Sequence, residues 1–406
     1  MSDGQGPDFN WLYTGKGTPP PEGQNSTPEP ESTRVMPVQQ RPGTGAGTPS
    51  GTPPTAPPAP PRQPPGPPKG TEYGSSRGRP SMPSFKRPRV KTIVRVILLV
   101  LVIWIGSLVW VGLGDVKALH KVAWEPSGTR PAAQPGRTYL IVGSDSRLGL
   151  SKAQKKRLDA GPDIGQRTDT IKLLHTGSGP TVMLTLPRDS YVPIPGHGSS
   201  KINAAFAWGG PELLVKTIEQ DTGLRIDGYV EIGMGGLINL VDSVGGITIC
   251  PTTNMTDPLA RLKIKKGCQH ADGFTALAYS RSRHAQKLGD LGRGEAQTEV
   301  IGQVGSKILS PTRLLNPFAL NALKPGISGI SVGKGMSNID VAKFGLAFRS
   351  VSAGKAMQCG IPISDMYIHW DKQRALKMLG YLKTDTTSQI PASLCTPSGL
   401  PKSVTG

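Results

Sequence analysis

The decapeptide TYLIVGSDSR at residues 138–147 indicates the fold class, because a short apolar run passes directly into small and charged polar residues. A run of this length, rich in β-branched and aromatic side chains, is typical of a buried strand that ends at a polar loop. Similar runs and helix-like periodicities follow, and glycines stand at the ends of the first two helical segments. Strands are predicted at 138–142, 170–174, 181–186 and 247–249, and helices at 202–221, 235–244 and 293–309. The alternation predicts a compact α/β domain.

The segment before this domain has two parts. Residues 1–92 are rich in Pro, Gly, Ser and Thr and hold few large apolar residues, so we expect a disordered tail. The stretch from Val96 to Leu113 contains no charged residue and is long enough for one membrane-spanning helix, which we assign to 93–114. The basic residues before it place the tail in the cytoplasm and residues beyond about 114 outside the cell. A cleaved signal peptide would lie nearer the N-terminus with a shorter apolar core.

The chain carries a formal charge of +19, of which about +13 lies after residue 95. Such a balance suggests nucleic acid, an anionic membrane or a phosphorylated substrate as partner. Because the predicted topology puts the basic domain outside the cell, it disfavours nucleic acid. The candidate site also lacks the interleaved aromatic residues that stack on bases.

All four cysteines lie beyond the apolar span, in what would be an oxidising compartment. Four cysteines allow three pairings. Cys250–Cys268 and Cys359–Cys395 are favoured because each closes a short loop. Four unpaired thiols remain the alternative.

Charged residues collect at the ends of three predicted strands. The first strand ends in GSDSR at 143–147, the segment QRTDT at 166–170 opens the next, and the third ends in PRDS at 187–190. Ligands of open α/β sheets bind in the crevice outside the strand ends. Because strand residues two apart share a face, we expect Arg167 and Asp169 to point into one site.

Two downstream groups have regular spacing. An extended chain over 279–283 would place Arg281 and Arg283 on one side, and a helix would place Asp290, Arg293 and Gln297 on one face. Taken singly, each charge is usually a solvated surface residue or half of a surface ion pair.

Clustered arginines with few neutralising carboxylates are costly unless an anion completes the site. Arginine binds phosphate oxygens bidentately, and Lys201 adds a cation near a predicted helix start. Asp145 and Asp169 suit Mg²⁺, or Mn²⁺, which takes carboxylates together with substrate phosphates. The residues alone therefore predict an extracytoplasmic, metal-assisted phosphate-binding domain, and they leave the substrate open.

In the same order along the chain, these residues resemble the LytR-CpsA-Psr family. The resemblance covers about residues 137–310, and the proline-rich tail and the Cys250/Cys268 pair resemble actinobacterial members. Family members often carry Arg before the glutamine, where this chain has Ala296. The motifs that carry the resemblance are 143–147, 167–170, 187–189, 201–205, 245–247 and 281–283, followed by Asp290, Arg293 and Gln297.

The resemblance implies an α/β/α sandwich with a mixed central sheet, and a pocket where arginines grip the pyrophosphate of a polyprenyl lipid beside an apolar tunnel. The implied reaction attaches a polyprenyl-pyrophosphate-linked glycopolymer to peptidoglycan and releases polyprenyl phosphate. By resemblance, Asp145 and Asp169 are metal or acid–base carboxylates. The implied catalytic residues are Asp145, Asp169, Arg167 and Asp290, and the implied pyrophosphate ligands are Arg147, Arg167, Arg188, Lys201, Arg281, Arg283, Arg293 and Gln297.

We therefore expect residues 115–136 to form a linker and first-strand region, 137–310 the catalytic domain, and 311–406 a helical flank of the same domain. The expected location is the cell membrane, single-pass with the catalytic domain outside. Two other functions use the same residues: a polyprenyl-pyrophosphate pyrophosphatase with water as acceptor, or a non-catalytic envelope protein that binds anionic polymer. The sequence has no motif that identifies the acceptor.

Overall fold

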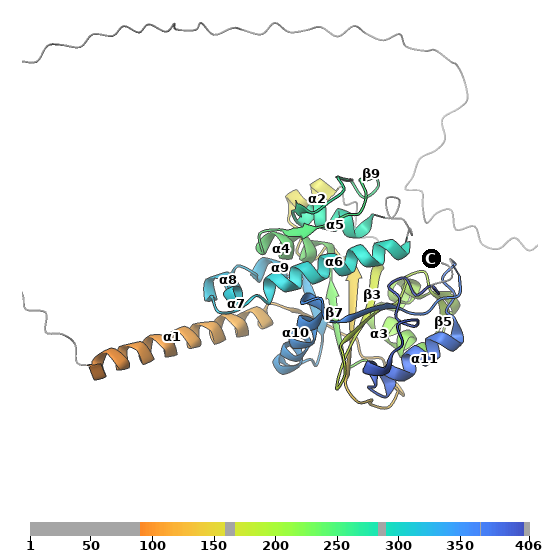
Figure 1. Cartoon of the computed structure of the whole chain (residues 1–406), viewed down its shortest axis with the longest axis horizontal. Coiled ribbons are helices and arrows are strands. Elements are labelled where there is room, and N and C mark those ends of the chain that lie inside the picture. Colours follow the sequence, from red (N-terminus) through yellow and green to blue (C-terminus); the bar gives the residue numbers. More distant parts are fainter. Residues whose placement is uncertain (1–89, 159–166, 283–289, 366, 402–406) are drawn as a thin grey trace, which may run out of the picture. The chain divides into compact units, whose positions relative to one another are not determined.

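A computed structural model of the chain describes residues 90–158, 167–282, 290–365 and 367–401, without the side chains of Asp115, Asp290 and Leu291 (Figure 1). Of the predicted tail at 1–92, residues 1–89 lie outside the described residues, and 90–92 belong to a helix that begins at Val90, three residues before the predicted start at 93. A seven-stranded mixed sheet forms the centre, and the expected α/β/α architecture is confirmed. Across the sheet the strands are β1 (His120–Val122), β12 (Ile330–Gly333), β7 (Gly228–Ile232), β2 (Arg137–Ser144), β3 (Thr168–Thr176), β4 (Val182–Thr185) and β13 (Met357–Gly360).

The strand directions bring several chain segments to one edge of the sheet. β2 pairs antiparallel with β3 and parallel with β7, and β3 pairs antiparallel with β4. The ends of β2, β4, β7 and β13 therefore meet the start of β3. β12 and β1 also begin at this edge, because β12 is antiparallel to β7 and parallel to β1.

Helices cover both faces of the sheet. On one face, α3 (Ile202–Thr222) and α11 (Lys372–Lys383) pack on buried Leu140 and Leu173. On the other, α10 (Asn338–Ser352) packs on Tyr139 and Ile141, and α6 lies alongside α10 (Figure 1). The other helices are α2 (Lys152–Leu158), α4 (Met234–Ser243), α5 (Gly273–Arg281), α6 (Asp290–Ile308), α7 (Pro311–Leu314), α8 (Pro317–Asn321) and α9 (Lys324–Ile327). In the described part of the chain, three small two-stranded antiparallel sheets pair β5 (Tyr191–Ile194) with β6 (Gly198–Lys201), β8 (Ile247–Ile249) with β11 (Gln269–Ala271), and β9 (Met255–Asp257) with β10 (Leu262–Ile264).

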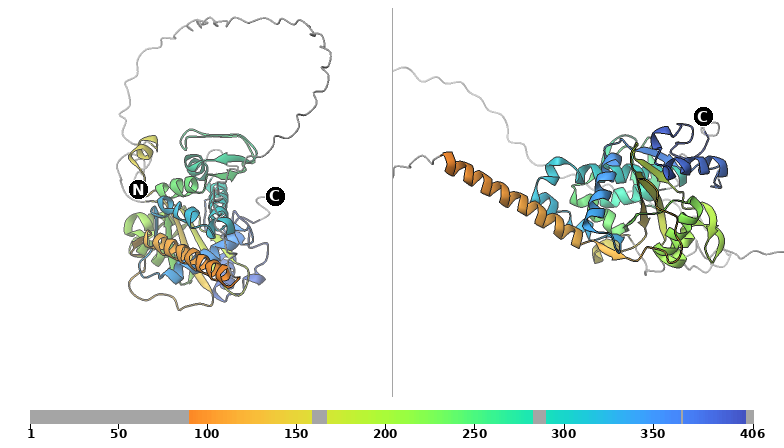
Figure 2. Two further views of the ribbon diagram at one scale, coloured as in Figure 1. Left: turned by 90° about the vertical axis from the view of Figure 1, so that its left-hand side faces the viewer. Right: turned by 90° about the horizontal axis from the view of Figure 1, so that it is seen from below.

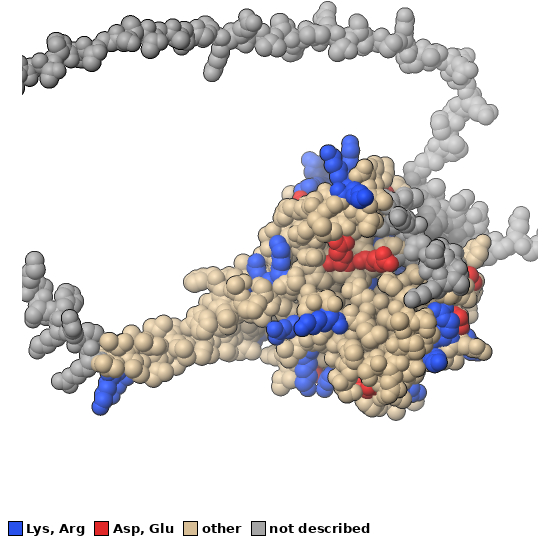
Figure 3. Space-filling view, in the orientation of Figure 1, with Lys and Arg blue, Asp and Glu red and all other residues tan. Residues whose placement is uncertain are grey.

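α1 (Val90–Lys117) is an exposed apolar helix that leads into the sheet. Its Val90–Gly114 portion is long and apolar enough to cross a membrane. Figure 3 shows this helix as an almost uncharged rod with basic side chains at the end away from the domain. Only Ala118 and Leu119 separate α1 from β1.

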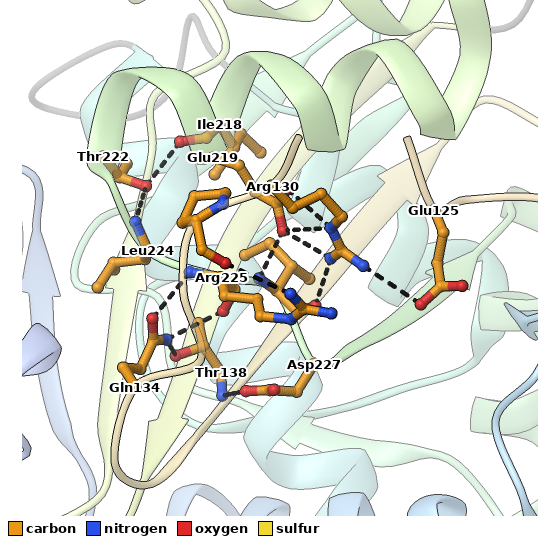
Figure 4. A network of polar contacts seen from close by, with 12 residues as sticks. Glu125, Arg130, Gln134, Thr138, Ile218, Glu219, Thr222, Leu224, Arg225 and Asp227 are labelled. Carbon is orange, nitrogen blue, oxygen red and sulfur yellow. Dashed lines mark hydrogen bonds and ion pairs between the residues drawn. The ribbon is translucent and has the colours of Figure 1, made fainter. Parts of the chain in front are cut away.

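The chain between β1 and β2 is held to α3 by a buried ion pair (Figure 4). Arg130 Nη2 and Nε lie 2.6 and 3.0 Å from the two carboxylate oxygens of Glu219, which is 3% exposed. Arg130 Nη2 also donates to Ile226 O at 2.7 Å, and the paired Glu219 raises the pKa of Arg130. Residues 125–138 are therefore fixed against the domain.

Residues 311–401 contain strands that the sequence reading did not anticipate. β12 and β13 join the central sheet on opposite sides, so this part of the chain is not purely helical. Each strand has four residues, too few to show the periodicity that distinguishes a strand from a loop.

The predicted disulfide pairings are both confirmed: Cys250 bonds Cys268, and Cys359 bonds Cys395. The first closes the segment that carries the β9–β10 hairpin. The second ties β13 to the C-terminal segment that passes over it.

Candidate active site

The β2–β3 register brings two predicted site residues into direct contact. β2 pairs with β3 up to Ser144 and Thr168, so Asp145 lies beside Arg167 at the sheet edge. The backbone amide of Arg167 donates to Asp145 Oδ1 at 2.7 Å, and the amide of Asp145 donates to Arg167 O at 3.0 Å. The Asp145 carboxylate is thereby oriented by the start of the neighbouring strand.

Asp169 is the centre of a second cluster. Arg188, just after β4, donates through Nη1 to Asp169 Oδ1, and Arg293 Nη1 from α6 lies 4.0 Å from the same oxygen. Gln297 Nε2, one turn further along α6, lies 3.5 Å from Asp169 O. These four side chains also line one small cavity of about 20 Å³, room for roughly one water molecule. Arg293 is only 2% exposed, so it is a buried cation rather than a solvated one.

Lys201 joins this cluster through Asp189, a residue for which no role was predicted from the sequence. Asp189 lies between two cations, 2.9 Å from Lys201 Nζ and 3.5 Å from Arg188 Nε. Lys201 is the residue that precedes α3, as the sequence predicted. The amide of Asn203 donates to Arg188 O at 3.2 Å, which fixes the loop after β4 to the first turn of α3. In the sequence, Asp189 stands next to Arg188, and that position alone does not reveal its contact with Lys201.

The expectation of an extended chain around Arg281 is wrong. Arg281 is the last residue of α5, which is capped by Asp272 through a side-chain bond from the Thr275 amide. The cap and the buried apolar face of the segment favour a helix over an extended chain. Arg281 Nη1 lies 3.5 Å from Met234 Sδ at the start of α4. Arg283 lies outside the described residues.

Two further predicted residues have less defined settings. Arg147 is in the loop after β2, where Ser146 O accepts from the Met234 amide at 2.9 Å. Asp290 opens α6, and its side chain lies outside the described part of the chain. The structure thus brings together side chains of Asp145, Asp169, Arg188, Lys201, Arg281, Arg293 and Gln297, with the Arg167 backbone bonded to Asp145.

The two carboxylates of the site repel each other. Burial and then the charge of Asp169 raise the pKa of Asp145, while the Arg167 amide and the charges of Arg167 and Arg281 act in the opposite direction. The net pKa is above the ordinary aspartate value. A proton or a cation at Asp145 relieves this repulsion.

The carboxylate pair is compatible with a magnesium ion that arrives with a phosphate ligand. Among the described residues no three His, Cys, Asp or Glu side chains form a metal cluster. Mg²⁺ commonly takes one or two protein carboxylates and fills its remaining positions with phosphate oxygens and water. Asp145 and Asp169 would supply the protein ligands.

A buried lysine beneath the site was missed by the sequence analysis. Lys172 on β3 is fully buried, and its Nζ donates to Thr185 Oγ1 and Thr298 Oγ1, each at 2.8 Å, and to Gly294 O at 3.2 Å. Burial lowers the pKa of Lys172 to about 7. The amine ties β3 and β4 to the first turns of α6, the helix that carries Arg293 and Gln297.

An apolar cavity of about 250 Å³ lies between the sheet and the covering helices. β2 and β7 contribute Ile141 and Val230, α6 contributes Ile301 and Val304, and α10 contributes Phe344. Val116 at the end of α1 and Leu119 also line it. The cavity expected from the family resemblance is therefore present in the core.

α6 carries both the polar site and the apolar cavity on one helix. Arg293 and Gln297 lie in its first half, and Ile301, Val304 and Ile308 line the cavity one to three turns later. At a rise of about 1.5 Å per residue, Gln297 and Ile301 are roughly 6 Å apart along the axis. The arrangement suits a ligand with an anionic head and an apolar tail.

A basic groove opens on the other side of Arg281. It has a volume of about 620 Å³, and Arg157, Arg261 and Lys263 line it together with Arg281. The guanidinium of Arg157 stacks 3.8 Å over the ring of Phe274, which also lines the groove. The clustered arginine and lysine side chains suit a ligand that carries anionic groups.

Known proteins share this fold and sequence pattern. The LytR-Csp2A-Psr enzyme from Actinomyces oris superposes with a TM-score of 0.53 at 22% identity, covering 65% of this chain and 96% of that chain. The probable cell wall biosynthesis protein LcpB of Corynebacterium glutamicum is 46% identical over 280 residues, 68% of this chain and 66% of the relative. The polyisoprenyl-teichoic acid–peptidoglycan teichoic acid transferase TagU of Enterococcus faecalis is 36% identical over 172 residues, 42% of this chain and 54% of the relative. The chain thus spans two-thirds or less of these two relatives' lengths.

The family sequence pattern itself covers most of the described domain. A model of the LytR_cpsA_psr family matches residues 118–369, from the end of α1 to the segment before α11. This range contains every predicted site residue and most of the apolar cavity lining. The chain therefore belongs to the LytR_cpsA_psr family.

Proposed function

We propose that this protein is a membrane-anchored transferase that attaches a polyprenyl-pyrophosphate-linked glycopolymer to peptidoglycan outside the cell. The observation that carries the proposal is that successive turns of α6 line first the anionic-head site and then the apolar cavity. The relatives support it through their names, which assign cell wall biosynthesis to LcpB and transfer of teichoic acid to peptidoglycan to TagU.

In this proposal the pyrophosphate lies at the sheet edge among Arg188, Arg281, Arg293 and Lys201. Charge-assisted bonds from these cations stabilise the negative charge that develops on the phosphoryl oxygens. The arginines now paired with Asp169 are then shared between the carboxylate and the phosphates. The prenyl chain occupies the apolar cavity.

The reaction is attack by a peptidoglycan hydroxyl on the glycopolymer-linked phosphorus. A new oxygen–phosphorus bond forms, the bond to the bridging oxygen breaks, and polyprenyl phosphate leaves. The hydroxyl proton passes to a carboxylate of the site. Mg²⁺, or Mn²⁺, held by Asp145 and Asp169, would neutralise phosphate charge when bound.

The membrane location follows from α1 and the basic residues before it. The proposed topology is single-pass, with the tail inside and the catalytic domain outside. The groove at Arg281 is the proposed path of the acidic saccharide, since Arg281 adjoins both the groove and the Asp145 site.

The test uses a glycine that lines the apolar cavity. Gly345 on α10 borders the cavity, and no atom lies within 4 Å of where its Cβ would be. Gly345→Leu should therefore fold and fill part of the cavity, lowering affinity for a long-chain polyprenyl pyrophosphate and the rate of glycopolymer transfer to peptidoglycan.

Gly380→Leu provides the matched control. Gly380 also lies in a helix with open space around its Cβ position, on α11, and it does not line the cavity. Unchanged prenyl binding in Gly345→Leu would contradict the lipid assignment. Release of free glycopolymer into water, without attachment to peptidoglycan, would identify a hydrolase instead.

A further inference from the structure

The connecting segment between α6 and β12 exposes apolar side chains in a well-defined conformation. Leu314 and Leu315 are 41% and 54% exposed, and Phe318 is 86% exposed. We call these three residues the apolar rim. Isolated exposed apolar residues are normal, but three large ones within five positions form a cluster of the kind that marks an interaction site.

The backbone that carries the apolar rim is fixed by helix caps and hydrogen bonds. Pro311 and Pro317 start α7 and α8, and the Asn316 side chain accepts from the amides of Phe318 and Ala319 at 3.0 and 3.2 Å. Arg313 Nη1 donates across to Ser243 O of α4 at 3.3 Å. The backbone therefore presents the rim outward in one arrangement.

The position of the rim next to α1 indicates its partner. α8 packs beside α1, as the three views in Figures 1 and 2 agree. The exposed fraction of Phe318 is measured with α1 in place, so α1 does not cover it. The span ends at Gly114 and β1 begins at His120, which limits the gap between them to no more than roughly 15 Å.

The charge around the rim fits an anionic lipid surface. From residue 301 to residue 329, the stretch that contains the rim, the chain has no Asp or Glu, and it has three cations, Lys307, Arg313 and Lys324. Apolar side chains flanked by basic ones are the pattern of segments that lie in the interface of a bilayer with anionic lipids.

We propose that the apolar rim inserts into the surface of the bilayer that α1 crosses, as a second membrane contact of the domain. The proposal rests on the membrane anchorage proposed above. The same segment bounds the apolar cavity, through Leu309 before the rim and Leu323 and Ile327 after it. Rim insertion brings this side of the cavity to the lipid, so that a prenyl chain passes between bilayer and cavity without crossing water.

Depth measurement in vesicles tests the contact directly. All four native cysteines are in disulfides, so a single introduced cysteine carries one nitroxide label. The full-length protein would be labelled at Phe318→Cys and reconstituted in vesicles of phosphatidylcholine and phosphatidylglycerol. Leu259→Cys is the control, because Leu259 is 83% exposed in the turn between β9 and β10.

The expected result is that the label at 318 is relaxed by oxygen and protected from a water-soluble nickel chelate, and the label at 259 shows the reverse. A label at 318 that behaves like the one at 259 would overturn the proposal. So would a label shielded from both reagents, because that indicates a protein partner or a second copy of the chain.

A charge substitution tests the consequence for lipid delivery. Phe318→Glu should slow turnover of a long-chain polyprenyl-pyrophosphate substrate embedded in the vesicle several-fold and leave turnover of a water-soluble short-chain analogue unchanged. Leu376→Glu, at a position on α11 that is 56% exposed and lines none of the cavities described above, should affect neither. Equal loss on both substrates would contradict the delivery role. The depth result needs no catalysis, so a failed transfer assay leaves it standing and tests only the proposed function.

Discussion

The amine of Lys172 is fully buried in the folded protein and has no contact with bulk water. Its amine has three protein acceptors, and burial lowers its pKa to about 7 from the ordinary 10.5. Between these two pH values the native state binds fewer protons than the unfolded state. The free energy of unfolding therefore rises with pH in this window. Below about pH 7 Lys172 is charged in both states, and the cost of burying its charge lowers the stability of the native state in full.

Replacing Lys172 should flatten this pH dependence. Relative to Lys172→Met, the stability of the wild-type protein should increase from pH 7 to pH 10, by at most about 1.4 kcal/mol per pH unit. Denaturant unfolding at several pH values measures it. Lys377→Met, at an exposed position on α11, should show no such trend. Parallel curves for wild type and Lys172→Met would show that the amine stays charged in the native state.

Asp169 and Arg281 should separate transfer from binding. Arg281→Ala removes a proposed charge-assisted contact and should weaken binding of lipid-linked substrate by about 1.5–3 kcal/mol. Asp169→Asn should abolish Mg²⁺-dependent transfer, because it removes a proposed metal ligand. Lipid binding should persist, because Arg188 and Arg293 no longer contact the Asp169 carboxylate and can bind the phosphate instead. The measurement is transfer rate and lipid affinity for both variants, with and without Mg²⁺. Full transfer activity in Asp169→Asn would refute the metal assignment.

The sequence predicted the cations and carboxylates that reach solvent at strand ends, since charged residues beside apolar runs stand out. The burial of Lys172 could not be predicted. In the sequence it resembles the solvent-facing residue of a strand whose side chains alternate between core and solvent. No role was predicted for Asp189, because a carboxylate between two cations is recognisable only when Lys201 is brought near through the β5–β6 hairpin. The pairing partner of Asp169 likewise depends on tertiary packing.

Among the elements, the segment before β2 depends on the Arg130–Glu219 pair. Both side chains are nearly buried, and Arg130 also satisfies Ile226 O. Glu219→Ala leaves the guanidinium without its partner inside the protein, which should cost about 3–5 kcal/mol of unfolding free energy. Thermal unfolding of the full-length protein in detergent measures this loss. The double variant Arg130→Met/Glu219→Met should recover most of it, and a loss equal to that of Glu219→Ala would mean that packing rather than charge dominates.

Long elements were predictable and short ones were not. α3, α4 and α6 begin or end within about three residues of their predicted bounds, because periodicity over ten or more residues is a strong signal. β12 and β13 are strands only because neighbours in the sheet supply their hydrogen bonds. The helical ending of α5 at Arg281 was missed because its N-cap, Asp272, lies nine residues upstream.

For the whole molecule, the proposed topology predicts which residues are reachable from outside. Leu259→Cys should react with a membrane-impermeant maleimide in intact cells, since the domain would lie outside. Lys91→Cys, at the other end of α1, should react only after lysis. The opposite pattern would place the domain in the cytoplasm and reopen a nucleic-acid partner for its basic surface.

The junction of α1 and β1 is too short to act as a tether. In the proposed arrangement the sheet edge with Asp145 and Asp169 cannot swing outward into the thickness of the wall, because two residues separate the helix from the first strand. The active site would therefore stay at a fixed distance from the bilayer surface. Selection of the acceptor glycan would then depend on its position as well as on its chemistry. Newly made glycan at the membrane could reach the site, and older layers of the wall further out could not.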